Sequence, residues 1–181
     1  RMVTKQVSFY EEMTNVPFII AGPGIHPRQK PVEDLLTQPT IDLLPTLCEL
    51  AGIPVPSSKP GISLAPFLKG EKQKRQHPYA ASEWHSEYEV TVSPGRMIRS
   101  PRYKYTHYLE GNGEELYDML KDKGERRNLA HDPKYSKILA EHRALLDDYI
   151  RRTQDDYRSL KVEADKRWRS HAPVSYTHLT L

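Results

Sequence analysis

The sequence predicts an α/β chain that continues into a small α+β subdomain, and three observations lead to this fold class. An apolar segment at residues 16–21 precedes an amphipathic helix pattern at 40–52, which is typical of one strand and one helix of an α/β sheet. Three β-leaning segments follow, separated by turn sequences, and a long amphipathic helix pattern begins after Asp132. We therefore expect the last strand and helix of an α/β domain, followed by a small antiparallel sheet packed against a long C-terminal helix.

The first strand and helix are predicted from their composition and their end signals. Residues 16–21 are apolar on both faces of a pleated strand, which is typical of a strand that is covered on both sides. In the helix at 40–52, Thr40 is a suitable N-cap and Gly52 a suitable C-terminal stop. Helical spacing places three leucines on one face, which we expect to be buried: Leu43, Leu47 and Leu50.

The small sheet is predicted from residues 79–85, 96–109 and 115–119, which favour extended backbone. In the middle segment, period-two alternation places Tyr103, Tyr105 and His107 on one face and Arg102, Lys104 and Thr106 on the other. We expect the aromatic face to be buried and the basic face to be exposed to water.

The proline-rich residues 54–78 predict an exposed connection between two domains. The last helix is expected to begin at the Asp132–Pro133 pair. We assign residues 1–68 to the incomplete large α/β domain and 69–160 to the small α+β subdomain. Residues 161–181 are expected to be a frayed or disordered tail, and its last seven residues look like translated adapter sequence rather than native protein.

Composition excludes several classes of function. The net charge of +3 comes from 27 basic and 24 acidic residues that are interleaved along the chain, which does not predict a nucleic-acid partner. No apolar run approaches the roughly 20 residues of a membrane helix. The single cysteine, Cys48, cannot form an internal disulfide, and no Cys/His cluster has zinc spacing.

The N-terminal part contains few residues that are candidates for catalysis or ligand binding. Lys5 precedes the Phe9-Tyr10-Glu11-Glu12 turn, and it is interpreted either as a ligand-binding residue at a sheet edge or as a solvated loop lysine. Glu11 and Glu12 are adjacent, so a helix-start or salt-bridge role is favoured over an acid/base pair. Cys48 is interpreted as a small buried hydrophobic residue rather than a nucleophile.

The β-leaning region offers further candidates. Trp84 and His85 can form an aromatic wall with a titratable donor, or they can be a core residue and a surface imidazole. His107 shares its face with two tyrosines, which favours core packing. Four basic residues can attract an anionic substrate or can belong to a solvated strand: Arg96, Arg99, Arg102 and Lys104.

Short sequence blocks in residues 5–150 resemble, in the same order, the second half of type I, formylglycine-dependent sulfatases of the alkaline phosphatase superfamily. The blocks are KQVSFYEE at 5–12, VPFII at 16–20, GPGI at 22–25, IDLLPTL at 41–47, AGIP at 51–54, GISL at 61–64, GRMIR at 95–99, RYKY at 102–105 and EELYD at 114–118, followed by Glu125, Asn128 and Leu129.

The resemblance implies a sulfuric ester hydrolase of the arylsulfatase type that acts on small-molecule or glycan sulfate esters, and a periplasmic or secreted location fits it. In this family a formylglycine, made from cysteine or serine in a C/S-x-P-S/A-R motif, attacks sulfur while Ca²⁺ and basic residues hold the sulfate oxygens. That motif is not in this sequence, and the resemblance places the calcium ligands upstream of Arg1. We therefore expect this chain to bind no cofactor and to be inactive alone.

The resemblance assigns sulfate binding to Lys5, although Lys5 precedes Tyr10 by five residues where the family usually has four. It also implies substrate recognition by side chains of the small sheet, for which the candidates are Trp84, His85 and His107. Two alternative functions stay open: a phosphonate monoester or phosphodiester hydrolase of the same superfamily, and a non-catalytic module that binds acidic glycans.

Overall fold

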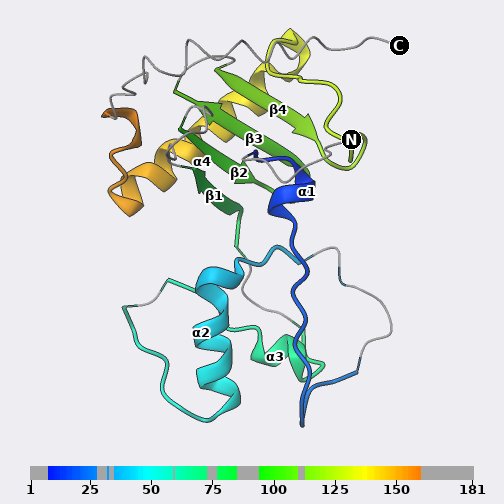
Figure 1. Cartoon of the computed structure of the whole chain (residues 1–181), viewed down its shortest axis with the longest axis vertical. Coiled ribbons are helices and arrows are strands. Elements are labelled where there is room, and N and C mark those ends of the chain that lie inside the picture. The colour runs from blue at the N-terminus through cyan, green and yellow to red at the C-terminus, as the bar shows by residue number, and fades with distance from the viewer. Residues whose placement is uncertain are drawn as a thin grey trace, which may run out of the picture.

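The computed structural model describes residues 8–27, 32, 35–58, 60–72, 77–84, 94–109 and 113–159. Figure 1 shows two parts along the longest axis: a sheet with the long helix α4 behind it, and below it the helices α2 and α3. The segment that follows α1 leaves the sheet and descends past α3 (Figure 1). The N-terminal residues therefore contribute to both parts.

Four strands form the sheet: β1 (Ala80–Trp84), β2 (Gly95–Arg99), β3 (Tyr103–Tyr108) and β4 (Glu114–Asp118). All neighbours are antiparallel and the spatial order follows the chain, β1-β2-β3-β4. In the register, Ile98 lies opposite Tyr105, and Tyr105 lies opposite Leu116. The small antiparallel sheet that the sequence predicted is confirmed.

The predicted middle segment, residues 96–109, is wrong as one strand because it turns back on itself. The Ser100 hydroxyl accepts a hydrogen bond from the Tyr103 N–H at 3.1 Å, and the Ser100 N–H donates to the Tyr103 carbonyl at 2.9 Å. Pro101 has no N–H to donate to a ladder, which suits it to this turn. The segment therefore supplies two strands, β2 and β3.

Helix α4 (Ser136–Thr153) covers one face of the sheet, after the 3₁₀ turn η1 (Pro133–Tyr135). The side chain of Asp132 caps that turn by accepting a hydrogen bond from the Lys134 N–H at 3.1 Å, in agreement with the predicted start. The core between helix and sheet consists of seven buried residues: Tyr79, Ile98, Tyr105, Leu116, Leu129, Leu139 and Leu146. Their burial holds the long helix against the sheet.

The opposite face of the sheet is also covered, and the prediction of a water-exposed face is wrong. The short helix α1 (Glu11–Thr14) and the residues before it lie against this face, where Lys104 and Thr106 are each 1% exposed. Alternation separated the two faces correctly. The expectation that the polar face meets solvent failed because a distant segment of the chain packs on it.

Below the sheet, α2 (Pro39–Leu50) packs beside α3 (Ala65–Leu68). Its buried residues are Asp42, Pro45 and Thr46. The fully buried Asp42 carboxylate accepts hydrogen bonds from the N–H of Gln38 at 2.7 Å and of Ile62 at 2.8 Å. Asp42 Oδ1 also lies 2.8 Å from Nε2 of His77. One carboxylate thus joins three segments of the chain.

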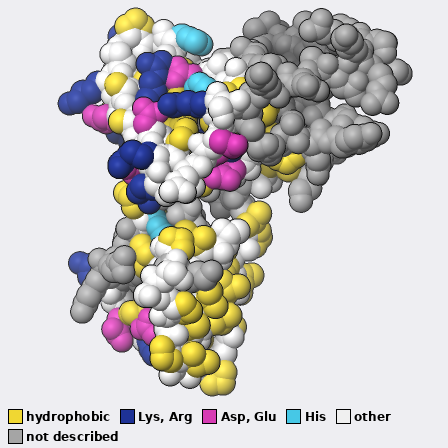
Figure 2. All heavy atoms as spheres, turned by 90° about the vertical axis from the view of Figure 1, so that its left-hand side faces the viewer, with side chains coloured by type: hydrophobic (Ala, Val, Ile, Leu, Met, Phe, Trp, Pro, Cys, Tyr) yellow, Lys and Arg dark blue, Asp and Glu magenta, His cyan; other side chains and the backbone are white. Residues whose placement is uncertain are grey.

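The predicted helix is confirmed, but its buried face is not the leucine face. Leu43 is 40% and Leu47 is 49% exposed, and Figure 2 shows hydrophobic side chains gathered on the surface of this lower part. The N-cap residue is Gln38 rather than Thr40, because Pro39 occupies the first turn. Periodicity found the apolar face of α2, whereas the chain itself packs on the opposite, polar face.

The predicted strand at residues 16–21 is not a strand here. Val16 is 60% and Ile19 is 86% exposed, and no described segment pairs its backbone with these residues. A strand requires a hydrogen-bonded neighbour, which an apolar pattern alone does not supply.

Three further expectations concern the domain boundary, the C-terminal tail and membrane-spanning helices. The division at residues 68 and 69 stays a prediction, and residues 161–181 lie outside the described part of the chain. Among the helices that the structure describes, none has the length and apolar character needed to cross a membrane.

Candidate functional site

Lys5, to which the resemblance assigns anion binding, lies outside the described residues. Phe9, four positions later, is 5% exposed and lies on the sheet face opposite α4. Phe9 thus attaches the N-terminal segment to the sheet. We take the residues around it as the candidate site and call them the N-terminal anchor: Phe9, Tyr10, Glu11, Lys104, Tyr108, Tyr117 and Glu125.

Lys104 projects from β3 into the centre of the N-terminal anchor. Its Nζ lies 2.8 Å from the Phe9 carbonyl oxygen, 2.8 Å from Glu11 Oε1 and 2.8 Å from Glu125 Oε1. The ammonium group thus donates a hydrogen bond to the Phe9 carbonyl and forms ion pairs with the two carboxylates. The contact with Glu125 Oε1 is an ion pair only, since this buried oxygen has no hydrogen-bond partner among the described residues. Because the side chain is 1% exposed, these oxygens replace water around the buried charge.

Glu125 completes the cluster from the loop after β4. It adopts a left-handed backbone conformation with a φ of 51°, which is uncommon for a residue other than glycine. Its Oε2 accepts a hydrogen bond from the Glu11 N–H at 2.7 Å. Burial raises the pKa of Glu125, while its contact with Lys104 favours the ionised form. One side chain therefore binds both the lysine and the backbone of α1.

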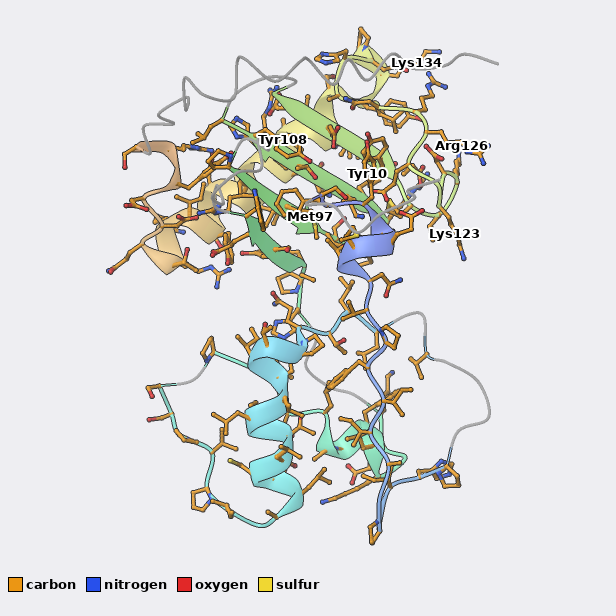
Figure 3. All side chains as sticks on the ribbon, in the orientation of Figure 1. Tyr10, Met97, Tyr108, Lys123, Arg126 and Lys134 are labelled. Atoms are coloured by element: carbon orange, nitrogen blue, oxygen red, sulfur yellow. The ribbon has the colours of Figure 1, made fainter. Side chains whose placement is uncertain are left out.

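Aromatic rings surround the charges on this face. The Phe9 ring centroid lies 5.8 Å from that of Tyr108, and Tyr10 lies 6.4 Å from Tyr117. Figure 3 shows Tyr10 and Tyr108 on the same side of the sheet. A Cβ at Gly95 would be 2.6 Å from Phe9 Cε2, so glycine at this position allows Phe9 to approach the strand. Burial raises the pKa of both Tyr10 and Tyr117.

The cations of the N-terminal anchor are paired with carboxylates of the same chain. Arg99 Nε lies 3.8 Å from Glu11 Oε1, and Lys104 contacts Glu11 and Glu125. Glu115 on the same face is a third carboxylate near Lys104, and its burial raises its pKa. The sequence-based preference for a helix-start and salt-bridge role of Glu11 is confirmed. The chemistry of this arrangement is to hold the Phe9–Glu11 backbone in place rather than to bind an external anion.

The interpretation of the basic strand residues as an anion-attracting surface is wrong. Arg96 is 3% exposed, and its Nε and Nη2 donate to Asp155 at 2.6 and 2.9 Å. Arg102 Nη2 lies 2.7 Å from Asp118 Oδ2. With Arg99 and Lys104 paired as described above, all four side chains contact carboxylates of the same chain, which neutralise their charge.

The predicted substrate-contacting residues do not gather at one point. His85 lies outside the described residues. In the register, Trp84 lies opposite Gly95 and therefore on the Phe9 side, whereas His107 lies opposite Arg96 on the α4 side. Trp84 and His107 are thus on opposite faces, and one small ligand on either face cannot contact both side chains.

His107 is bound within the subdomain. Its Nδ1 lies 2.8 Å from the hydroxyl of Tyr157, and this hydroxyl donates to the His107 carbonyl at 2.8 Å. Both bonds form when Nδ1 carries the proton. Burial lowers the pKa of His107, which favours the neutral ring. This agrees with the core-packing interpretation.

Trp84 is half-buried, and its indole N–H has no hydrogen-bond partner among the residues that the structure describes. Cys48 is half-buried on α2. The described residues contain no group of three or more His, Cys, Asp or Glu side chains that could hold a metal ion, so they assign no ligand to Ca²⁺.

Sequence reasoning named Lys104 only as an anion-attracting or solvated residue, and it gave Glu125 no role in a site. Lys104 stands between two tyrosines within a strand, and this pattern is the same for an exposed lysine and for a buried, paired one. The choice between them depends on Glu125 and Glu11, which are 21 positions after and 93 positions before Lys104. Periodicity carries no information about contacts at such separations.

Comparison with known proteins shows the family to which the chain is similar. Residues 4–152 match a family model described as "N-sulphoglucosamine sulphohydrolase, C-terminal". A Delta 4,5-hexuronate-2-O-sulfatase from Bacteroides thetaiotaomicron is 75% identical over 178 residues, which is 98% of this chain and 37% of that protein. The chain therefore spans just over a third of the length of this relative.

Two solved structures extend the comparison. A 2-O GAG sulfatase superposes with a TM-score of 0.87 at 77% identity, covering 96% of this chain and 37% of that one. A second protein, solved with its substrate D-glucosamine-2-N,6-O-disulfate, has a TM-score of 0.57 and 27% identity and covers 65% of this chain and 25% of that one. The small sheet with its long helix matches the C-terminal subdomain of the first structure.

Proposed function

Because the chain belongs to the sulfatase family whose model describes the C-terminal region of N-sulphoglucosamine sulphohydrolase, we propose that it is the C-terminal part of a sulfuric ester hydrolase that acts on sulfated glycans. The observation that carries this proposal is the 75% identity, over 98% of the chain, to a Delta 4,5-hexuronate-2-O-sulfatase. The substrate class that follows is a glycan-derived hexuronate with a 2-O-sulfate.

The proposal includes the division of the chain. Residues 1–68 are the last part of a large α/β domain, 69–160 form the small α+β subdomain, and 161–181 are a tail. The exposed leucines of α2 support this division, since an apolar helix face normally packs against another layer. In the whole protein, the large domain supplies that layer.

Lys5 is the proposed sulfate-binding residue of this chain. A sulfate ester carries negative charge that increases on the departing and equatorial oxygens during hydrolysis, and an ammonium group near them lowers the barrier. The described residues support this role by fixing the backbone from Phe9 to Glu11. Trp84 and His85 are proposed to contribute to the rim of the pocket, and His107 to support it from the α4 side of the sheet.

Sulfatases generally use Ca²⁺ and formylglycine, and the proposal extends both to the whole protein. Formylglycine would supply the nucleophile that attacks sulfur, and Ca²⁺ would supply the cation that holds the sulfate oxygens. The part assigned to this chain is to position Lys5 and to shape the pocket.

The test is sulfate release by the full-length protein, measured by ion chromatography. We expect turnover of Δ4,5-hexuronate 2-O-sulfate to exceed that of 6-O-sulfated glucosamine and of an aryl phosphonate monoester by about a hundredfold or more. Preference for the phosphonate would support the alternative phosphonate monoester hydrolase. Binding of the sulfated sugar without sulfate release would support a non-catalytic glycan-binding module.

A further inference from the structure

Lys104 is buried, and two of its partners belong to the N-terminal segment that follows Lys5 in the chain. We propose that Lys104, together with Glu125, is a positioning residue: it fixes the Phe9–Glu11 backbone on the sheet and thereby sets the place from which Lys5 reaches the sulfate. This inference rests on the proposed function of Lys5.

The first argument is that three oxygens, one of them a hydrogen-bonded carbonyl and two of them carboxylate oxygens, surround the ammonium group. Two of these oxygens, those of the Phe9 carbonyl and the Glu11 carboxylate, belong to the N-terminal segment, and the third belongs to Glu125. All three distances are 2.8 Å. Arginine cannot reproduce this arrangement, because its planar guanidinium directs its N–H groups into one plane.

The second argument is that the N-terminal segment is held from two sides. Glu125 Oε2 accepts from the Glu11 N–H at 2.7 Å, while its Oε1 contacts Lys104. The Phe9 ring packs on Tyr108 at 5.8 Å. Backbone carbonyl, backbone N–H and side chain are therefore all engaged within three consecutive residues, which is more than burial of one aromatic ring requires.

The third argument is the short covalent distance to Lys5. Lys5 and Phe9 are four positions apart, and a fully extended chain covers at most about 3.6 Å per residue, or about 14 Å. The place of Phe9 therefore limits the region that Lys5 can reach. Because a displacement of about 1 Å can reduce a rate about a hundredfold, the position of Phe9 matters for turnover.

The fourth argument is the energetic character of the cluster. A buried ion pair often stabilises a fold no better than apolar side chains of similar volume, but it enforces one arrangement of its partners. Methionine in place of Lys104 would fill similar space without specifying where the Phe9 carbonyl and Glu11 lie. A positioning role explains why charge is found at this buried place.

The experiment is a double-mutant cycle in the full-length enzyme, with sulfate release from Δ4,5-hexuronate 2-O-sulfate as the assay. The single variants are Lys5→Ala and Lys104→Met, and they are combined in the double variant. We expect Lys5→Ala to lower kcat about a hundredfold. We expect Lys104→Met to lower kcat about tenfold or more with a smaller change in KM, and to have less than about a threefold effect in the Lys5→Ala background.

Leu146→Ala is the matched control for stability. Leu146 is 0% exposed and belongs to the core between α4 and the sheet, on the face opposite Lys104. This variant should lower the melting temperature but leave kcat unchanged at temperatures where the protein is folded. If Lys104→Met does not fold, Glu125→Gln enters the same cycle, since it removes one charge and keeps the shape of the side chain.

The outcomes separate the two proposals. If Lys5→Ala retains full activity, the proposed role of Lys5 is wrong. If Lys5→Ala is impaired but the effects of Lys104→Met and Lys5→Ala multiply independently, or if Lys104→Met affects kcat no more than Leu146→Ala, the positioning role is overturned. Non-additive effects confined to the Lys5–Lys104 pair would support it.

Discussion

The close approach of Gly61 to helix α2 leads to the sharpest stability prediction. A Cβ added at Gly61 would be 1.9 Å from the carbonyl oxygen and 2.6 Å from the carbonyl carbon of Ile41. Both atoms are backbone atoms of a helix, so they cannot rotate away as the end of a flexible side chain would. In Gly61→Ala, residues 61–64 must therefore move away from α2.

Two hydrogen bonds cross the same contact and allow the cost to be worked out. Ile62 N–H donates to Asp42 Oδ1 at 2.8 Å, and Leu64 N–H donates to Thr46 Oγ1 at 2.9 Å. A hydrogen bond to a charged group contributes about 1.5–3 kcal/mol, and overpacking costs about 1–3 kcal/mol. Strain together with loss of the Asp42 bond gives a destabilisation of about 3 kcal/mol or more.

The assay is the free energy of unfolding of the full-length protein, measured by urea titration for Gly61→Ala and for the control Gly22→Ala. A Cβ at Gly22 has no heavy atom within 4 Å, so we expect this control to lie within about 0.5 kcal/mol of wild type. A value for Gly61→Ala within about 1 kcal/mol of wild type would refute the close contact. The reasoning about α2 would then be wrong as well.

Two further predictions concern charged groups. Asp42→Asn places an amide N–H₂ against N–H donors that bind a carboxylate in the wild type, and it should lower the free energy of unfolding by about 1.5–3 kcal/mol. Asp156→Asn, at an exposed position, serves as the control. Equal effects of the two substitutions would contradict the hydrogen-bond network around Asp42. The hydrogen bonds from Arg143 lower the pKa of Glu114 to about 2. This pKa lies below the ordinary value of 4.5, so ionised Glu114 stabilises the folded state. Its contribution to the free energy of unfolding is complete above about pH 4.5 and is lost as the pH falls toward about 2. Arg143→Gln should therefore flatten the decrease of stability over this range in pH-dependent urea titrations, and an unchanged profile would contradict the pairing.

Local patterns predicted most of the small subdomain. Asp132 and Pro133 marked the start of the last helical region, and the amphipathic pattern after them predicted a helix with one face on the sheet, which is the face that carries Leu139 and Leu146. These features depend on residues within a few turns of one another, so periodicity and capping rules apply directly. The Ser100 turn was missed because the residues on both sides of it favour extended backbone.

The site was predicted less well, because its members come from distant parts of the chain. Alternation placed Lys104 on the polar face of β3, but it could not show that the N-terminal segment covers this face. Trp84 and His107 were both assigned to substrate recognition, and only the register placed them on opposite faces. Register follows from pairing between strands, which a single strand sequence does not specify.

The sequence by itself determined the element types of the subdomain, the separation of β3 into an aromatic and a polar face, and the resemblance to sulfatases. Tertiary structure alone decided that Lys104 is buried, that Glu125 and the Phe9 carbonyl share its ammonium group, and that α2 packs through Asp42 instead of its leucines. The physical reason is that a buried charge is stable only where several acceptors meet, and residues far apart in the chain meet only when it folds.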